Sequence, residues 1–565
     1  MGLHVADYLV LLLYFITITF IGIWSARKLR DSNDFFMPRK FGKLMMAMFS
    51  FGTGTHSDQA VSVAAKSFTN GLSGIWYQWL WLPVTPFYWL IAPIFRRFRA
   101  VTTADVFEAR FDGSVSALYA FIGVLNLSVN IGVMLKGAGA VISASTGHLV
   151  SSNAAIAVMT ILFVIYGVAG GLSAAIITDF IQGILTVFFS FALLPLILNA
   201  VGGFEGIRST VGDSEIFSLV APNDIGFFYI AVIAINALVG IVTQPHTMSN
   251  CGAGRTELEG RVGFMFGTLL KRVCTIPWAL TGIAAVAYFA GTDIHPDKVF
   301  GAVAGDFLPK LVPGLLGLFL AALIASVMSS CDVFMVSSSA LFTENIYRRF
   351  RPNKAARHYI LVARITAILV VSGGVYFAFR LPSVVKGLET FWIISSMMGI
   401  AFWLGLFWRR TTTAGAWAAT ITAFAIWWLT TQSFFITFLG QIPIASQLRI
   451  VTGQRSEMTI YLPWQMVFYL AGGTAAGIIV SLLTRDVAKD KLDIFYALIR
   501  TPVRVGEKII TPCTLPEGTK VPDRRKLFHK TNIEIPIPSR TSIIGFLIGW
   551  ICVAALIGAV YLITQ

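Results

Sequence analysis

Charged residues are scarce in this chain of 565 residues: aspartate, glutamate, lysine and arginine make up 13% of it, while hydrophobic residues make up 56%. The mean hydropathy is +0.75. One soluble core cannot bury so much apolar surface, so the scarcity of charge excludes an ordinary soluble enzyme or binding protein. Because a helix needs about 20 apolar residues to cross a bilayer, the sequence predicts an all-α integral membrane protein with about fourteen transmembrane helices.

Cysteine is also rare. The five cysteines stand singly, without the spacing of a metal site, at Cys251, Cys274, Cys331, Cys513 and Cys552. This pattern predicts neither disulfide bonds nor a zinc site. The sequence also lacks a grouping typical of a nucleophilic or metal-dependent active site, so an enzyme embedded in the membrane is a weak alternative.

Positive charge is in excess, with a formal net charge of +15. In a soluble protein this would suggest nucleic acid, but in a membrane protein it indicates orientation, and we expect no nucleic-acid partner. Lysine and arginine gather in alternate loops, most densely at 27–43, 96–110 and 348–357. Such loops face the cytoplasm, so both termini are predicted to face outward from the plasma membrane. For this orientation we assign Lys271 and Arg272 to the inner membrane face.

The predicted spans divide the chain into six parts. A peripheral N-terminal transmembrane helix at 8–26 precedes a first core repeat of five spans at 44–200 and a second at 226–407. Peripheral spans at 413–483, a basic cytoplasmic segment at 484–540 and a C-terminal transmembrane helix at 541–563 follow. The basic segment carries twelve lysines and arginines. We interpret it as a positive-inside signal that lies against anionic lipid, with a partner-binding module as the alternative.

Polar residues interrupt three of the predicted spans. The segment 50–66 contains Gly52-Thr53-Gly54-Thr55-His56-Ser57-Asp58-Gln59, the segment 236–250 contains Asn236, Gly240, Gln244, Pro245 and His246, and the segment 311–341 contains Ser326, Ser329, Ser330 and Asp332. A helix that faces lipid has no use for such residues. The first two segments lie five spans apart, the offset expected between two inverted repeats, and both are predicted to be broken helices.

An unwound helix offers backbone carbonyls that have lost their intrahelical partners, and hard cations prefer such oxygen ligands. A neutral cage of five oxygens is available from the carbonyls of Gly52, Thr55 and Ser326 and the hydroxyls of Ser329 and Ser330. The sequence therefore predicts a sodium site. The alternative for each single serine is a hydrogen bond back to its own helical turn.

Two carboxylates have open roles. Asp179, at the inner end of the sixth predicted span, is a candidate for function because it lies at membrane depth, or else serves as a helix cap or a salt-bridge partner. Asp332 lies one turn after Ser329 and either holds a second cation or pairs with Lys136 or Arg364. A second cation and a structural role both remain open for this pair.

Four segments carry a recognisable pattern, at 99–111 (RAVTTADVFEARF), at 170–182 with its glycine pair and Thr-Asp-Phe-Ile-Gln, at 328–347 and at 406–411. Over about residues 8–430 the chain resembles the sodium/solute symporter family, which includes the sodium/glucose cotransporters. The resemblance implies a LeuT-like core of five plus five helices in inverted repeats. It also implies a sodium site at the positions that match Gly52, Thr55, Ser326, Ser329 and Ser330.

The resemblance bears on the solute as well. The family's sugar transporters place polar side chains at positions that match Gln59, Gln78 and Lys271, which implies a sugar or a polyol. Asp58 and Lys136 add charges that a neutral sugar does not require, and Asn236 and Gln244 add polar groups in the second broken span, so an organic acid or amino acid stays open. Lys136 is alternatively a paired structural charge. The aromatic run at 76–81 is interpreted mainly as an interfacial belt.

We therefore predict a secondary active transporter, not an enzyme, that couples Na+ to a small polar organic solute by alternating access. It is expected to function as a monomer in the lipid bilayer. A sodium-independent uniporter or channel on the same scaffold is the main alternative, and its signature is transport that ignores sodium.

Overall fold

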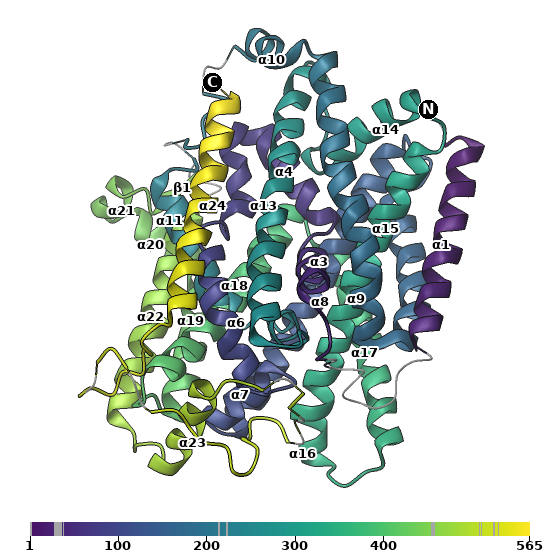
Figure 1. The fold of residues 1–565 in the computed structure, drawn as a ribbon. Coiled ribbons are helices and arrows are strands. Elements are labelled where there is room, and N and C mark those ends of the chain that lie inside the picture. The colour runs from purple at the N-terminus through teal and green to yellow at the C-terminus, as the bar shows by residue number, and fades with distance from the viewer. Residues whose placement is uncertain are drawn as a thin grey trace.

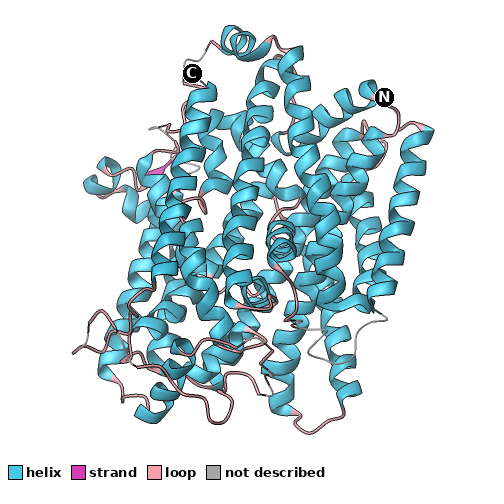
Figure 2. Ribbon diagram, in the orientation of Figure 1, coloured by secondary structure: helices cyan, strands magenta, loops and turns pink. Residues whose placement is uncertain are grey.

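The computed structural model describes residues 3–564 except 27–36, 38, 213–214, 222–223, 454–457, 505, 508, 510, 524–525 and 529. The side chains at 18–19, 21–26, 165–175, 177–179 and 446 are also outside the description. Helices make up most of the described chain (Figure 2). The only pairing between strands in this part is a short antiparallel hairpin, β1 (Val451–Thr452) with β2 (Thr459–Ile460).

The helices follow one another in chain order. The first group comprises α1 (Val5–Ala26), α3 (Lys43–Thr53), α4 (Ser57–Asn70), the 3-10 turn η1 (Gly71–Ile75), α5 (Trp76–Trp79), α6 (Thr85–Arg97), α7 (Thr103–Arg110), α8 (Gly113–Ser145), α9 (Ser152–Ala200) and α10 (Gly203–Val211). The second comprises α11 (Phe227–Ile241), α12 (His246–Gly252), α13 (Glu257–Tyr288), the 3-10 turn η2 (Pro296–Lys298), α14 (Val299–Leu311), α15 (Leu315–Phe342), the π turn η3 (Thr343–Tyr347), α16 (Arg348–Phe350), α17 (Ala356–Arg380) and α18 (Val384–Phe407). The last comprises α19 (Thr413–Thr430), α20 (Ser433–Gly440), α21 (Pro443–Gln447), α22 (Leu462–Leu483), α23 (Lys489–Arg500) and α24 (Arg540–Thr564).

Long apolar helices dominate the bundle. Within the described residues, eight helices are long and apolar enough to cross a membrane, or up to ten if each sharply bent pair counts as one span. The expected number of about fourteen therefore stays a prediction. One reason for the difference is that α3 and α4, the two halves of a predicted span, have only 11 and 14 residues.

The expected break in this span is confirmed, because residues 54–56 separate α3 from α4. The second expected break is also confirmed: α11 and α12 are bent by 72° at residues 242–245. By contrast, no break divides the fifth predicted span from the sixth, since α9 runs unbroken from Ser152 to Ala200.

The residues at both helix breaks are buried inside the bundle, among them Thr55 and His56 at the first and Thr243 and Gln244 at the second. Helix α13 packs against α3, α4 and α6, while α15 packs against α8 and α9. Helix α1 lies at one edge of the molecule, and α19, α22 and α24 lie at the other (Figure 1). Both termini lie at one end, and α7, α16 and α23 lie at the opposite end (Figure 1). The helices at the edges therefore surround a centre that contains α3, α8 and α13.

Close backbone contact holds α13 against the first broken helix. A Cβ atom at Gly282 would lie 2.4 Å from the carbonyl oxygen of Ala64 in α4, and one at Gly267 would lie 2.3 Å from the carbonyl oxygen of Ala47 in α3. Both distances are too short for a side chain. The glycines therefore set the distance between α13 and the two halves of the break.

We expect Gly282→Val to destabilise the protein, because the new side chain would push α13 away from α4. Overpacking of this kind costs about 1–3 kcal/mol. The measurement is the apparent melting temperature in detergent. The matched control is Gly558→Val in α24, where a Cβ would meet nothing within 4 Å. Equal melting temperatures for the two variants would contradict the close-contact interpretation.

The basic segment at 484–540 docks on the protein at the end opposite the termini. Leu492, Phe495 and Tyr496 of α23 are buried, and Glu507 forms an ion pair with the buried Arg99. Burial alone would raise the pKa of Glu507, but hydrogen bonds from Arg99 and from the backbone of Arg504 lower it. Helix α23 and Glu507 of this segment therefore contact the rest of the protein, while most of the described residues between 511 and 532 are exposed. The interpretation as a lipid-bound signal stays a prediction.

Candidate functional site

The break between α3 and α4 leaves backbone oxygens without helical partners. The amide of Thr55 donates to the carbonyl of Gly52 at 3.1 Å, which closes the last turn of α3 tightly. His56 then has an extended backbone, with φ −136° and ψ 177°, before α4 begins at Ser57. Glycines at 52 and 54 make this unwinding inexpensive. The carbonyls of Gly54 and Thr55 are consequently free of intrahelical bonds and accept hydrogen bonds from other helices.

Helix α15 presents hydroxyl groups to this break. Ser326 donates from Oγ to the carbonyl of Thr55 at 2.9 Å, and Ser330 donates from Oγ to the carbonyl of Gly52 at 3.4 Å. Ser329 is buried and, three residues after Ser326, shares the same face of the helix. Hydrogen bonds thus join four of the five residues predicted to bind sodium, although Ser326 contributes its hydroxyl and not the predicted carbonyl. The fifth, Ser329, adjoins Ser330 in α15.

The chemistry of this oxygen cluster suits a weakly held monovalent cation. All five groups are neutral, and in addition the buried Thr55 hydroxyl has no hydrogen-bond partner within the described part of the chain. Within the described residues, no three or more His, Cys, Asp or Glu side chains come together as a metal-binding group. A cation held only by neutral oxygens can be released again, as a transported ion must be.

The structure places one of the two predicted carboxylates, Asp332, and not the other, Asp179. The side chain of Asp179 lies outside the described residues. Asp332 is buried in α15, one turn beyond Ser329.

A polar cavity adjoins the break. Residues of α3, α4, α6, α8, α11, α12, α13, α15 and α18 all contribute to its lining. Ser50, Thr53, Gly54 and His56 line it from the first broken helix, and Gln244, His246 and Asn250 line it from the second. Both breaks therefore line one shared polar space at the centre of the protein.

Three of the predicted solute residues line this cavity, namely Gln59, Gln244 and Lys271. The Lys271 ammonium donates to the carbonyl of Gly54 at the helix break. The Gln59 side chain is buried, and its oxygen has no hydrogen-bond partner among the described residues. These side chains can contact a bound solute directly.

The other four predicted solute residues are not among those that line the cavity, and three of them have side-chain partners elsewhere. Asp58 is buried and pairs with His56. Lys136 donates to the carbonyl of Leu381, and Asn236 accepts a hydrogen bond of 2.6 Å from the hydroxyl of Tyr469. The backbone carbonyl of Gln78 accepts a hydrogen bond from Arg272, and its buried side-chain amide has no hydrogen-bond partner among the described residues. The hydrogen-bond partner of Lys136 is thus a neutral carbonyl, and the alternative of a paired structural charge stays a prediction.

Sequence reasoning missed several lining residues, including Trp81, Asn130, His246, Asn250 and Arg272. The assignment of Lys271 and Arg272 to the inner membrane face is wrong, because both are buried near the middle of α13 and line the cavity. A signal was available: two adjacent cations inside an apolar span are expensive unless they serve a function.

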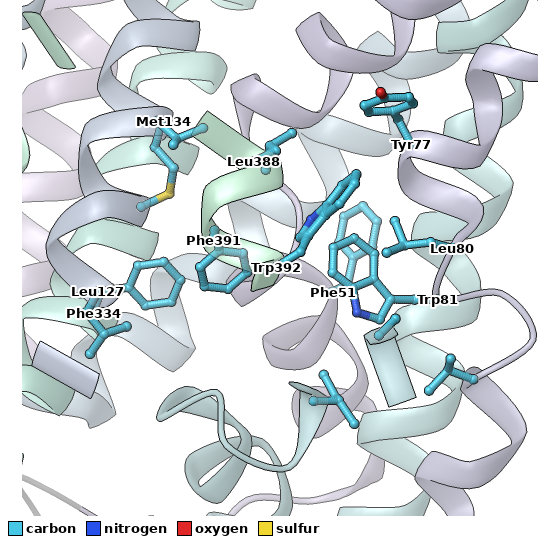
Figure 3. Close-up of a cluster of buried hydrophobic side chains, with 14 of the residues drawn as sticks. Phe51, Tyr77, Leu80, Trp81, Leu127, Met134, Phe334, Leu388, Phe391 and Trp392 are labelled. Carbon is cyan, nitrogen blue, oxygen red and sulfur yellow. The ribbon is translucent and has the colours of Figure 1, made fainter. Parts of the chain in front are cut away.

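The aromatic run at 76–81 does not form an interfacial belt. Trp76, Tyr77, Trp79 and Trp81 are all buried within the protein. Trp81 packs edge-on against Trp392 of α18, with ring centroids 5.7 Å apart, and Figure 3 shows these two side chains close to each other. Periodicity cannot distinguish a belt that faces lipid from aromatic rings that pack between helices. Trp81 instead forms part of the cavity wall together with Phe334, Leu388 and Phe391.

Comparison with known proteins gives a consistent result. Residues 35–423 match the model of the sodium:solute symporter family. An osmoregulated proline transporter of Bacillus subtilis is 26% identical over 86% of this chain and 96% of its own length. A sodium/pantothenate symporter of Escherichia coli is 24% identical over 78% of this chain and 93% of its own. The sodium/myo-inositol cotransporter 2 of Sus scrofa is 26% identical over 74% of this chain and 68% of its own length.

A solved structure resembles the whole bundle. A Na+-coupled sialic acid symporter, in a substrate-bound outward-open state, superimposes with a TM-score of 0.69 at 19% identity, over 86% of this chain and 99% of that one. This likeness supports the predicted all-α, LeuT-like fold. Because the relatives are transporters of different solutes, the comparisons leave the solute of this chain open.

Proposed function

The chain belongs to the sodium:solute symporter family, and from this premise we propose that sodium held at the α3–α4 break drives a small polar organic solute through the central cavity. Sodium is the coupling ion, and the protein is a multi-pass membrane protein. The proposed sodium ligands are oxygens of Gly52, Thr55, Ser326, Ser329 and Ser330. The proposed solute ligands are Gln59, Gln244 and Lys271, from among the side chains that line the cavity.

One observation carries this proposal: the oxygen cluster and the cavity share the same helix break. The carbonyls of Gly52 and Thr55 accept hydrogen bonds from serine hydroxyls of α15. The carbonyl of Gly54, which lies between them in the chain, accepts a hydrogen bond from Lys271, a residue of the cavity lining. An ion that orders residues 52–55 therefore also positions part of the solute site. In thermodynamic terms, each ligand then favours binding of the other by the same factor.

The energetics fit a transporter that concentrates its solute. One sodium ion that moves through ~100 mV supplies about 2.3 kcal/mol, and a tenfold gradient supplies about 1.4 kcal/mol more. At one-to-one coupling to a neutral solute this supports accumulation of roughly 500-fold. Neutral ligands hold sodium weakly enough for release on the inner side.

The test is uptake into proteoliposomes that contain the purified protein, with an inward sodium gradient or with potassium in its place. The panel holds labelled sugars, polyols, amino acids and organic acids, since the sequence favours a sugar or polyol and leaves the acids open. Accumulation that requires the sodium gradient is expected. Equilibration that ignores sodium would instead identify a uniporter and overturn the proposal.

We also propose a plasma-membrane location with both termini outside, because lysine and arginine are concentrated in the loops at the other end of the molecule. The exposed residues His4 and Thr514 offer a test in a cysteine-free background. In intact cells, an impermeant thiol reagent should label His4→Cys and leave Thr514→Cys unlabelled. Labelling in the reverse pattern would invert the orientation.

A further inference from the structure

Two adjacent cations stand in the wall of the central cavity without an acidic partner. Lys271 and Arg272 in α13 are only 5% and 2% exposed, and both line the cavity. No aspartate or glutamate lines it. In the part of the chain that the structure describes, no carboxylate lies within salt-bridge distance of either cation, while the nearby Asp58 pairs with His56.

The hydrogen bonds that these cations make bring no negative charge. Lys271 donates to the carbonyl of Gly54, and Nη1 of Arg272 donates to the carbonyl of Gln78 at 2.7 Å. The guanidinium of an arginine stays protonated in proteins, and a buried charge is costly unless it is paired. The fold therefore holds at least one buried positive charge that the described protein groups do not neutralise.

The two cations and an indole N–H belong to one corner of the cavity. The Lys271 ammonium lies 5.6 Å and the Arg272 guanidinium 5.5 Å from the ring centroid of Trp81. Nε of Arg272 and Nε1 of Trp81 are buried donors for which the described residues supply no acceptor. A carboxylate accepts several hydrogen bonds at once and carries the missing charge.

The other polar side chains that line the cavity are amides, hydroxyls and two histidines, and none of them is a carboxylate. The side-chain oxygens of Gln59, Asn130 and Asn250 line the cavity or its wall and have no hydrogen-bond partner within the described residues. Such oxygens accept from hydroxyl groups. A free ammonium group would satisfy them too, but it would add a third positive charge to a site that already holds two cations and no carboxylate.

We propose that the solute is a hydroxylated carboxylic acid, with its carboxylate held by Lys271, Arg272 and Trp81 and its hydroxyl groups held by Gln59, Asn130 and Asn250. This inference rests on the proposed function, because it assigns the solute of the same cavity. It replaces the neutral sugar or polyol that the sequence favoured with an acid of similar size, such as a sugar acid.

The test compares molecules that differ mainly in the carboxylate. Proteoliposomes receive glucuronate or glucose, galacturonate or galactose, and glycerate or glycerol, each with an inward sodium gradient and with potassium in its place. Thermal unfolding of the purified protein with each compound, in sodium, provides a second readout. We expect at least one acid to be taken up at least tenfold faster than its neutral partner and to raise the melting temperature.

The outcomes separate the two proposals. Sodium-driven uptake of a neutral partner at a rate equal to or above that of its acid overturns the carboxylate assignment and leaves symport standing. Uptake of an acid that ignores sodium overturns symport and leaves the assignment standing. If no acid is taken up or raises the melting temperature, the assignment is overturned, while a sodium-specific rise in melting temperature still supports the ion site.

A charge-removing variant locates the anchor. Arg272→Gln keeps a hydrogen-bond donor near the carbonyl of Gln78 but loses the charge, and we expect the preference for acid over neutral partner to fall at least tenfold. Trp81→Phe, which keeps the ring and loses the N–H, tests the same corner if Arg272→Gln folds poorly. The matched control is Arg261→Gln, a buried arginine of α13 that contacts Ser542 outside the cavity. Equal preference in the Arg272 and Arg261 variants overturns the anchor.

Discussion

Replacement of both Ser329 and Ser330 with alanine is expected to raise the sodium concentration for half-maximal uptake at least tenfold. The double variant removes two of the five oxygens proposed for the ion, including the hydroxyl that lies 3.4 Å from the carbonyl of Gly52. Each neutral hydrogen-bonding group contributes about 0.5–1.5 kcal/mol to the free energy of the interaction. A loss of about 1.4 kcal/mol in binding free energy corresponds to a tenfold loss of affinity. The measurement is a sodium titration of solute uptake, with a parallel titration of thermal stability.

Two serines of the same helix supply a matched control. Ser338 and Ser339 are buried in α15, and their hydroxyls bond back to the carbonyls of Met335 and Val336, three residues earlier in each case. Replacement of both with alanine also removes two hydroxyls from α15, but at a distance from the break. Sodium dependence should then match that of the native protein. If both double variants behave alike, the serines at 329 and 330 hold no ion.

The sodium cluster illustrates what sequence can predict. Ser326, Ser329 and Ser330 have the i, i+3, i+4 spacing that places residues on one face of any helix. The glycines and hydroxyls at 52–55 mark a break that apolar residues on either side make visible. Both features are local in sequence, so only the contact between the two segments required tertiary information. The chemistry of oxygen ligands suggested that contact, and the family resemblance implied the same five positions.

The solute residues show where this reasoning stops. Asp58 and Gln59 are neighbours in the same broken span, yet the first pairs with His56 and only the second lines the cavity. Likewise, Gln244 lines the cavity while Asn236 turns to Tyr469 of α22. The direction of each side chain depends on how its helix is rotated against neighbours that are distant in sequence. A single charge within a span was no better a signal, since Asp58 and Lys136 do not line the cavity, whereas the adjacent cations Lys271 and Arg272 both do.

The recognised motif at 99–111 presents the opposite case, because its residues were found from sequence but their role was not. Arg110, the last residue of α7, is 2% exposed. It donates from Nε to the carbonyl of Gly405 at 2.7 Å and from Nη2 to those of Trp408, Arg409 and Thr411 at 3.0–3.3 Å. These carbonyls lie around the C-terminus of α18, where a positive charge is also favoured by the helix dipole.

We expect Arg110→Ala to destabilise the protein by about 3 kcal/mol, because hydrogen bonds from a charged donor are worth about 1.5–3 kcal/mol and their loss leaves buried carbonyls unpaired. The measurement is the apparent melting temperature in detergent. The control is Arg348→Ala, an arginine at the same end of the molecule whose side chain is 49% exposed and pairs with Glu344 four residues earlier. Exposed pairs of this kind contribute about 0.3–0.5 kcal/mol. A large loss of stability for Arg110→Ala and a small one for Arg348→Ala would show that Arg110 of the motif stabilises the C-terminal end of α18. Similar losses for the two variants would contradict this role.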